Sequence, residues 1–451
     1  MEKTDFFSNL EKNILESYQF NNELFDKYDV KCGLRNKDGT GVLAGLSNIG
    51  FVVGYKKEDD GVYAVPGKLV YRGIDITDLV KGFQNDKRIG FEETIYLLIT
   101  GSLPTKNELY FFSEHMTCLR NLPDSFINDM ILTLKGKNVL NILARSVLGL
   151  YILDEKPDDI SLPNMIKQTL DIIAKFPSII AYAFHAYKHA YKGETLSIRH
   201  PQKTFSIAEN FLYMIKGTNR YTKLEIETLD LALVLHAEHG GGNNSTFTMR
   251  VTSSSETDIY SSVAAAIGSL KGPLHGGANL KVVDMMEDFK TNINNWEDED
   301  EISKYILKIL KKNAYDKTGK LYGMGHAVYT ISDPRAILLR EKAKDLAKEK
   351  GNYHEWKLYA KVEKLAPKVF NEYKGNNTKK ICVNVDFYSG FVYSCIGIHK
   401  ELFTPLFAMA RIAGWCTHRI EELIFSKKQI IRPAFKNVNP IKEYVSIHKR
   451  K

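Results

Sequence analysis

The chain has 451 residues, of which 44% are apolar and 26% are charged, and its formal net charge is +8. This length exceeds one small core and predicts two domains, or one large and one small domain. The composition is ordinary for a globular protein. Because no basic and aromatic module stands out, the positive charge fits an anionic small molecule and does not indicate nucleic-acid binding.

No apolar run approaches the roughly 18 to 20 residues that a membrane span needs. The amino terminus, MEKTDFFSNLEKN, is charged where a signal peptide is apolar. The five cysteines have no CxxC spacing and are typical of reduced thiols. We therefore expect a cytoplasmic protein that has no membrane segment.

The first predicted element is a small β-hairpin in residues 51–73, with its turn at Asp59, Asp60 and Gly61. Little else alternates with period two, and helical signals dominate the rest of the chain. No GxGxxG motif follows a strand, which argues against a dinucleotide-binding or P-loop protein. The sequence predicts a mainly α-helical fold with one amino-terminal hairpin.

Two helices are predicted from capping boxes, one at Thr105 and one at Thr222, each followed by Glu three residues later. The second helix runs through LALVL and is expected to end at Gly240. His236 and His239 would then share its last turn, where the negative end of the helix dipole should raise their affinity for a proton. Two histidines three residues apart face the same side and suit either a metal or a substrate.

Glycine-flanked histidines occur in two further segments, KGPLHGGAN with His275 and GMGHAVYTISDPRA with His326. In the second segment Asp333 and Pro334 form a strong helix start, as N-cap and first helical residue. Arg335 is then fixed in the first turn, beside the positive end of the helix dipole. This arrangement predicts an anion site.

Isolated charges occur in three apolar segments near the carboxyl end. Asp386 stands in ICVNVDFYSG, where burial would raise its pKa toward the range of a general base. Arg411 stands in AMARIAGW, and Arg432 precedes a proline in IIRPAF.

Each of these residues also has a structural interpretation. His236 alone is typical of a buried core histidine, Asp386 of a helix cap, and Arg411 of a side chain that extends to the surface. The combination of several histidines, one isolated acid and three isolated arginines favours a binding or catalytic site. No cysteine or second acidic cluster completes a metal site among them.

The segments HAEHGGGNNSTFT, KGPLHGGAN, GMGHAVYTISDPRA, VNVDFYSG and RIAGW resemble, in order and spacing, the citrate synthase family, and within it the bacterial enzymes of the Si-face type. The opening GLRNKDGTGVLAGLSNIG is also similar, so the resemblance covers essentially the whole chain.

The resemblance implies an all-helical two-domain homodimer of the tricarboxylic acid cycle. Its large domain would comprise residues 1–276 and 388–451, and a small domain would be inserted at residues 277–387. The substrates would be oxaloacetate and acetyl-CoA, without a metal or prosthetic group. The implied catalytic residues are His275, His326 and Asp386. The implied substrate-binding residues are His236, His239, Arg335, Arg411 and Arg432, the last from the other subunit.

The chain departs from some relatives at two positions. Ala327 and Thr330 stand where some of them have arginine. The second of these arginines meets the CoA phosphates, so this contact is unassigned here, with Lys317 and Lys320 as candidates.

The same residues suggest three alternative functions. The first is 2-methylcitrate synthase, which uses propionyl-CoA with the same catalytic residues, since one methylene is worth only about 1–3 kcal/mol in a pocket. The second is a metal-dependent hydrolase using His236, His239 and His275. The third is a non-catalytic acyl-CoA binder, which is disfavoured because every catalytic position is filled.

Overall fold

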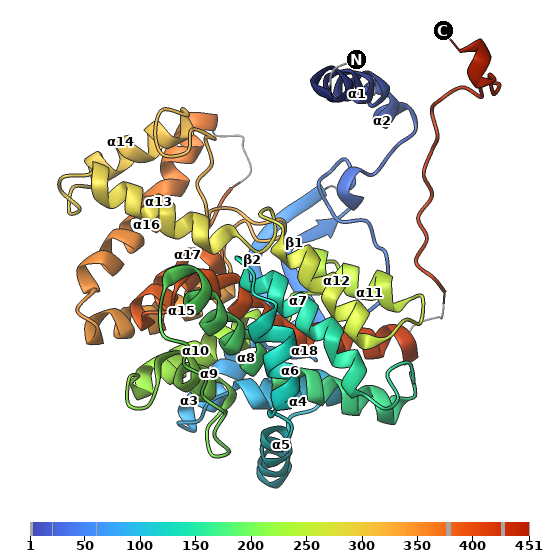
Figure 1. The fold of residues 1–451 in the computed structure, drawn as a ribbon. Coiled ribbons are helices and arrows are strands. Elements are labelled where there is room, and N and C mark those ends of the chain that lie inside the picture. Colours follow the sequence, from blue (N-terminus) through green and yellow to red (C-terminus); the bar gives the residue numbers. More distant parts are fainter. Residues whose placement is uncertain (1–2, 20, 60, 376–379, 425–428, 451) are drawn as a thin grey trace. The chain divides into compact units, whose positions relative to one another are not determined.

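Helices make up most of the structure, a computed structural model that describes residues 3–19, 21–59, 61–375, 380–424 and 429–450 (Figure 1). Across these residues the only sheet has three strands in the order β1-β2-β3. The predicted fold class, mainly α with an amino-terminal hairpin, is confirmed.

The chain divides into two compact units. One spans residues 1–46 and 57–62, and the other residues 47–56 and 63–451. The first unit contains helices α1 (Lys3–Ser17) and α2 (Glu23–Lys27) and a 3-10 turn at Cys32–Leu34. The predicted domain boundaries at residues 277 and 387 are not tested by this division and stay a prediction.

The second unit holds nearly all of the helices. Those before the first predicted site residue are α3 (Ile76–Asn85), α4 (Phe91–Thr100), α5 (Lys106–Cys118), α6 (Asp124–Phe126), α7 (Val139–Gly149), α8 (Leu162–Lys192) and α9 (Ile207–Lys216), with a π-helical segment at Ile127–Thr133 and a 3-10 turn at Leu150–Leu153. Those that follow are α10 (Lys223–His236), α11 (Asn244–Ser253), α12 (Ile259–Lys271), α13 (Ala278–Asn292), α14 (Glu299–Leu310), α15 (Pro334–Glu349), α16 (Tyr353–Lys374), α17 (Val385–Ile396) and α18 (Phe403–Ile424), with 3-10 turns at Lys400–Leu402 and Ile447–Lys449.

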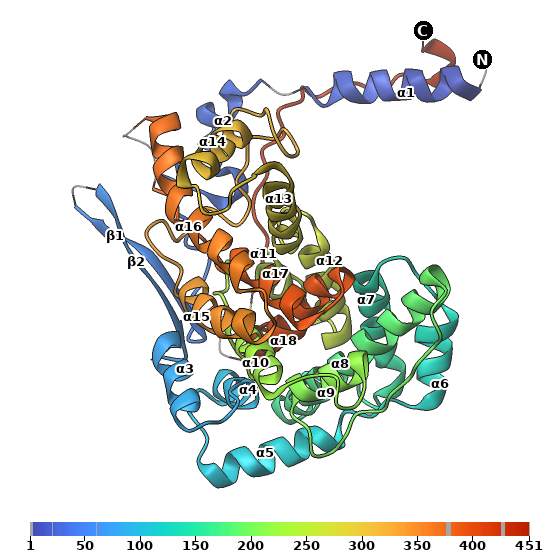
Figure 2. The ribbon, with the colours of Figure 1, turned by 90° about the vertical axis from the view of Figure 1, so that its left-hand side faces the viewer.

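The predicted hairpin is present as β1 (Gly50–Glu58) and β2 (Gly61–Tyr71), which run side by side in Figure 2. Asp60, in the predicted turn, lies outside the described residues. The short strand β3 (Ile74–Asp75) pairs antiparallel with the end of β2. Asp75 then caps α3 by accepting the Thr77 N–H at 2.9 Å.

Both predicted capping boxes are present, at the starts of α5 and α10. The predicted end of α10 is wrong, because the helix stops at His236 and not at Gly240. The Tyr71 hydroxyl explains this end. It lies 3.0 Å from the Val234 carbonyl and 3.3 Å from the Glu238 N–H, two groups that a continuing helix would join directly. A side chain from β2 thus replaces the next helical hydrogen bond.

Helix α18 is buried along almost its whole length and packs against α8, α10, α11 and α12. In Figures 1 and 2 it lies among these helices. A helix surrounded by others must be apolar on every side, which is true of most of α18. Arg411 and Arg419 are therefore exceptional, with side chains almost fully removed from solvent.

Candidate active site

Six of the eight predicted site residues come from the ends of helices or from the connections between them, and a seventh, Arg411, comes from the interior of a helix. His236 ends α10, and His239 follows in the next turn. His275 lies between α12 and α13, and His326 lies before α15. Arg335 and Asp386 occupy the first turns of α15 and α17, and Arg411 lies within α18.

Ring contacts show how these segments meet. The centroids of the His239 and His326 rings are 5.1 Å apart. The Phe407 ring of α18 lies 5.0 Å from the His236 ring and 6.2 Å from the His275 ring. The Arg411 guanidinium lies 4.7 Å from the same Phe407 ring. Phe407 therefore joins two of the histidines to the buried arginine.

His236 and His239 are buried and favour the neutral form. Burial lowers the pKa of His236 to about 3, and burial together with Arg335 lowers the pKa of His239 well below its usual value. The expected gain in proton affinity from the helix end is therefore wrong, because desolvation of the cation outweighs the dipole. His236 uses Nδ1 toward the Ala232 carbonyl, at 2.7 Å. Among the described residues, Nε2 of both His236 and His239 is buried without a hydrogen-bond partner.

His275 is oriented by Ser245, the first residue of this site that sequence reasoning did not single out. The Ser245 N–H donates to His275 Nε2 at 3.3 Å, and the Ser245 hydroxyl lies 2.9 Å from the same nitrogen. The ring proton is then on Nδ1, which makes Nδ1 a donor. Burial and Arg411 lower the pKa of His275 to about 4, so this donor is a neutral imidazole.

His326 is oriented by its own loop. Its Nδ1 accepts the N–H groups of Val328 and Tyr329, at 3.0 and 3.2 Å. The proton is therefore on Nε2, which makes that nitrogen a donor. The Tyr329 ring stacks on His326 with centroids 4.7 Å apart and meets the His239 ring edge-on at 5.6 Å. Tyr329 is thus a second residue that the sequence did not identify.

Asp333 and Arg335 form a buried pair. Asp333 caps α15, as predicted, but its carboxylate also accepts two side-chain hydrogen bonds from Arg335, at 3.0 and 2.7 Å. Burial alone would lower the pKa of Arg335, and the Asp333 carboxylate raises it above its ordinary value. The pair uses Nε and Nη2 of the guanidinium, which leaves Nη1 for a ligand.

Arg411 is the least compensated charge of the site. It is 0% exposed, and its Nε donates to the His236 carbonyl at 2.6 Å. Its Nη1 and Nη2 are buried and lack a hydrogen-bond partner within the described part of the chain. Burial lowers the pKa of Arg411 to about 10, so it stays cationic at neutral pH. Two unpaired guanidinium nitrogens match the two oxygens of a carboxylate.

Asp386 has the environment of a general base. It lies in the first turn of α17, whose N-cap is Asn384. Burial raises its pKa to about 6, with smaller effects of Arg335, Asp333 and Arg411. The expectation of a raised pKa is confirmed, and the carboxylate is ionised and basic near neutral pH.

Arg432 does not join the other seven residues within this chain. It is exposed, in the segment after α18, where the Ile431 N–H donates to the Ser254 hydroxyl at 3.1 Å. The two lysines considered for the CoA phosphates, Lys317 and Lys320, are exposed in the connection between α14 and α15.

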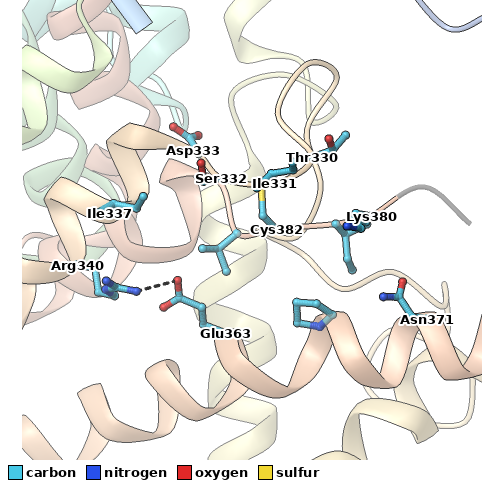
Figure 3. A pocket seen from close by; sticks show the side chains of 13 residues that line it. Thr330, Ile331, Ser332, Asp333, Ile337, Arg340, Glu363, Asn371, Lys380 and Cys382 are labelled. Atoms are coloured by element: carbon cyan, nitrogen blue, oxygen red, sulfur yellow. Dashed lines mark hydrogen bonds and ion pairs between the residues drawn. The ribbon is translucent and has the colours of Figure 1, made fainter. Parts of the chain in front are cut away.

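A cavity of about 430 Å³ lies beside these residues, between α15, α16 and the 380–383 segment (Figure 3). Arg340 of α15 points toward Glu363 of α16 across it, at 3.3 Å. Asp333 lines it, but none of the eight predicted site residues does. The cavity is therefore separate from the predicted site residues.

In the described ranges, no three or more His, Cys, Asp or Glu side chains form a group able to hold a metal. Within the same ranges, no helix is long and apolar enough to cross a membrane.

Comparisons with known proteins show the family of the chain. A family model described as "Citrate synthase, C-terminal domain" matches residues 37–434. A citrate synthase from Deinococcus radiodurans is 37% identical over 355 residues, which cover 79% of this chain and 86% of the relative. A 2-methylcitrate synthase from Shewanella oneidensis is 30% identical over 383 residues, or 85% and 90% of the two chains.

The chain is also similar to a solved citrate synthase from Thermoplasma acidophilum in a ternary complex with carboxymethyl coenzyme A and oxaloacetate. The TM-score is 0.76 and the identity 26%, with 93% of this chain and 99% of the other covered. The fold and these similarities define a helical acyltransferase. The chain belongs to the citrate synthase family.

The unpaired guanidinium of Arg411 predicts that this site lowers the stability of the fold. We expect Arg411→Met to raise the free energy of unfolding by about 1–3 kcal/mol, because it removes a buried charge with two guanidinium nitrogens that lack a hydrogen-bond partner among the described residues. Urea unfolding at neutral pH measures the change.

Arg419 is the matched control on the same helix. It is equally buried, but its guanidinium donates to the Ser253 and Ser262 hydroxyls and to the Thr257 carbonyl. Arg419→Met should therefore lower the free energy of unfolding by about 1–3 kcal/mol. An equal loss of unfolding free energy in both variants would contradict the expected difference between Arg411 and Arg419.

Proposed function

We propose that the chain is a citrate synthase of the Si type, which condenses acetyl-CoA with oxaloacetate and hydrolyses citryl-CoA to citrate and CoA. The observation that carries this proposal is the pair of unpaired Arg411 nitrogens near neutral histidines and an acid whose pKa is raised to about 6. A dicarboxylate would supply the missing partners, and the acid would supply the base. The ligands of the Thermoplasma acidophilum complex support the same substrates.

Oxaloacetate would bind first, with its carboxylates on Arg335 and Arg411. Arg411 can pair bidentately through Nη1 and Nη2, whereas Arg335 can donate from Nη1 alone, because Asp333 occupies its other two nitrogens. The loss of water on closure strengthens each pair. His239 would add a hydrogen bond to a carboxylate or to the ketone, with His236 beside it. The neutral state of His239 suits this role, since a neutral imidazole can donate without adding further positive charge to a buried cationic site. His236 already donates from Nδ1 to the Ala232 carbonyl, so its Nε2 is not a donor.

Enolisation of acetyl-CoA would follow. The methyl protons of a thioester are weakly acidic, so removal needs a placed base together with a donor to the forming enol oxygen. Asp386 would take the proton, and the Nδ1–H of His275 would donate to the thioester oxygen. The low pKa of His275 keeps this donor neutral, so it stabilises the enol without a net charge of its own.

Carbon–carbon bond formation completes the condensation. The enol carbon would attack the ketone of oxaloacetate, whose oxygen takes a proton from Nε2 of His326 and becomes the hydroxyl of citryl-CoA. The proton that Asp386 removed from the methyl group balances the one that the hydroxyl gains. Water then cleaves the thioester and releases citrate and CoA. These steps use side chains alone, so the proposal includes no metal or prosthetic group.

The proposed assembly is a homodimer in which Arg432 reaches the partner's site. Its support is the exposure of Arg432 in the chain described here, together with the resemblance. The proposed setting is the cytoplasm and the tricarboxylic acid cycle, and the five free cysteines suit a reducing compartment.

The acyl substrate is the finer part of the proposal, because a 2-methylcitrate synthase is among the relatives. We expect kcat/KM to be higher for acetyl-CoA than for propionyl-CoA by about 10-fold or more, the scale that one methylene supports. Steady-state rates of CoA release with saturating oxaloacetate give the ratio. A preference for propionyl-CoA would replace the proposed activity by 2-methylcitrate synthesis.

Asp386 is expected to control the acidic limb of the pH profile. Its pKa of about 6 means that the base is ionised above this pH and protonated below it, so kcat/KM should fall as the pH drops through about 6. Asp386→Asn should lose about 10²- to 10⁴-fold in kcat and abolish exchange of acetyl methyl protons with solvent. Oxaloacetate binding, measured by calorimetry, should persist. Near-normal turnover in this variant would remove Asp386 from the mechanism.

Mixed dimers test whether Arg432 acts across subunits. Arg432→Ala and Asp386→Asn homodimers should each be nearly inactive. In a mixed dimer, the site on the Arg432→Ala chain keeps its own Asp386 and receives an intact Arg432 from its partner. Refolding both variants together should recover about one quarter of wild-type activity, since random pairing makes about half of the dimers mixed. Verified mixed dimers without recovered activity would place Arg432 in its own subunit's site.

A further inference from the structure

A buried carboxylate lies between the two histidines of the HAEHG turn, and the steps above do not use it. Glu238 is 0% exposed, although a carboxylate is rarely buried unless it is paired or bonded. Its Oε1 accepts the Gly240 N–H, which closes the turn directly after His239. Gly240 adopts a φ of +80°, a backbone conformation that favours glycine.

The second partner of Glu238 is His418, on α18. His418 Nδ1 accepts the Nε–H of Arg250 at 3.0 Å, which leaves the ring proton on Nε2. That Nε2 lies 3.0 Å from Glu238 Oε1 and donates to it. His418 is itself 0% exposed. One carboxylate oxygen therefore receives two hydrogen bonds, one from the turn and one from the central helix.

Arg250 fixes the outer end of this chain of contacts. Its guanidinium pairs with Glu421 and Glu422, the latter at 2.6 Å. The Asn48 N–H donates to Glu421 at 2.7 Å and ties in the segment that leads to β1. The imidazole is thus held from both sides and cannot turn away from Glu238 without breaking an ion-paired network.

Two glycines form a slot for the Glu238 side chain. A β-carbon on Gly50 of β1 would lie 2.6 Å from its Oε1, and one on Gly414 of α18 would lie 2.5 Å from its Oε2. Both distances are shorter than any van der Waals contact, so a larger residue would displace the carboxylate. Gly414 lies three residues after Arg411, on the side of α18 that meets the turn.

We propose that Glu238 is a positioning residue, which with His418 holds the His236–Gly240 turn so that Nε2 of His239 faces the substrate. The proposal rests on the proposed function, because it assigns that nitrogen to oxaloacetate. The carboxylate does not touch the substrate. It acts through the Gly240 N–H on one side and through the α18 helix on the other.

Oxaloacetate affinity separates positioning from a purely structural role. Glu238→Ala should raise the dissociation constant for oxaloacetate by about 10-fold or more, the scale expected when an orienting partner is lost. Glu238→Gln keeps an oxygen that accepts both hydrogen bonds and should stay within about 3-fold of wild type. Calorimetry without CoA gives these constants, and thermal unfolding gives the stability of each variant.

Glu225 is the matched control, at the other end of α10. It is 1% exposed and pairs with Lys216 and Lys350, at 3.0 and 2.9 Å. Glu225→Ala should lower the melting temperature without changing the dissociation constant.

His418→Leu tests the same network from the other side, if Glu238→Ala does not fold. The double variant Glu238→Ala/His418→Leu should have a dissociation constant for oxaloacetate within about 2-fold of that of the weaker-binding single variant, because both substitutions act through one contact.

Three outcomes would overturn the proposal. These are unchanged affinity in a destabilised Glu238→Ala or His418→Leu, a Glu238→Gln variant as weak as Glu238→Ala, and additive losses in the double variant. Failure of the wild-type protein to bind oxaloacetate would instead overturn the proposed function.

Discussion

The burial of the Arg411 guanidinium is the constraint on which the rest of the site depends. The Arg411 cation lies in the middle of α18, is far from water and donates one hydrogen bond, from Nε to the His236 carbonyl, among the described residues. The desolvation cost lowers the pKa of Arg411 to about 10 without neutralising it. The fold therefore keeps a charge that a carboxylate ligand would neutralise, and it does so by packing α18 against several helices, α8, α10, α11 and α12 among them.

Burial and, to a smaller degree, the arginines shift the pKa values of four neighbouring groups. Burial and the nearby arginines lower the pKa of His236, His239 and His275, so these rings are neutral and add no further positive charge. For Asp386, burial raises the pKa more than Arg335 and Arg411 lower it, so the pKa rises to about 6. The same low-polarity surroundings thus make imidazoles neutral donors or acceptors and make a carboxylate a stronger base.

The site also depends on close approach between segments that are distant in the sequence. The hydroxyl of Tyr71 takes the place of a helical hydrogen bond at the end of α10, and the turn that follows carries His239. Glycines on β1 and α18 let both elements reach the Glu238 carboxylate. Removing these contacts would lengthen the helix or displace the turn, and either change moves the His239 ring away from His326.

Much of the site was predictable from local sequence. The capping boxes at Thr105 and Thr222 and the Asp333-Pro334 helix start depend on residues within four positions of one another, and all three are present. The isolated acid in ICVNVDFYSG also suggested a raised pKa, because an apolar run signals burial. These features follow from chemistry that neighbouring residues share, which a sequence displays directly.

Other features depend on contacts between segments far apart in the chain, and no local pattern encodes them. The end of α10 was misplaced because Tyr71 lies on a strand 163 residues before Val234. The protonation of His236 and His239 was misjudged because burial, and not the helix dipole, sets it. The sequence by itself determined which side chains are able to bind an anion or move a proton. Only the tertiary structure decided which nitrogen of each imidazole carries the proton and which charges remain unpaired, because hydrogen-bond partners and desolvation come from packing.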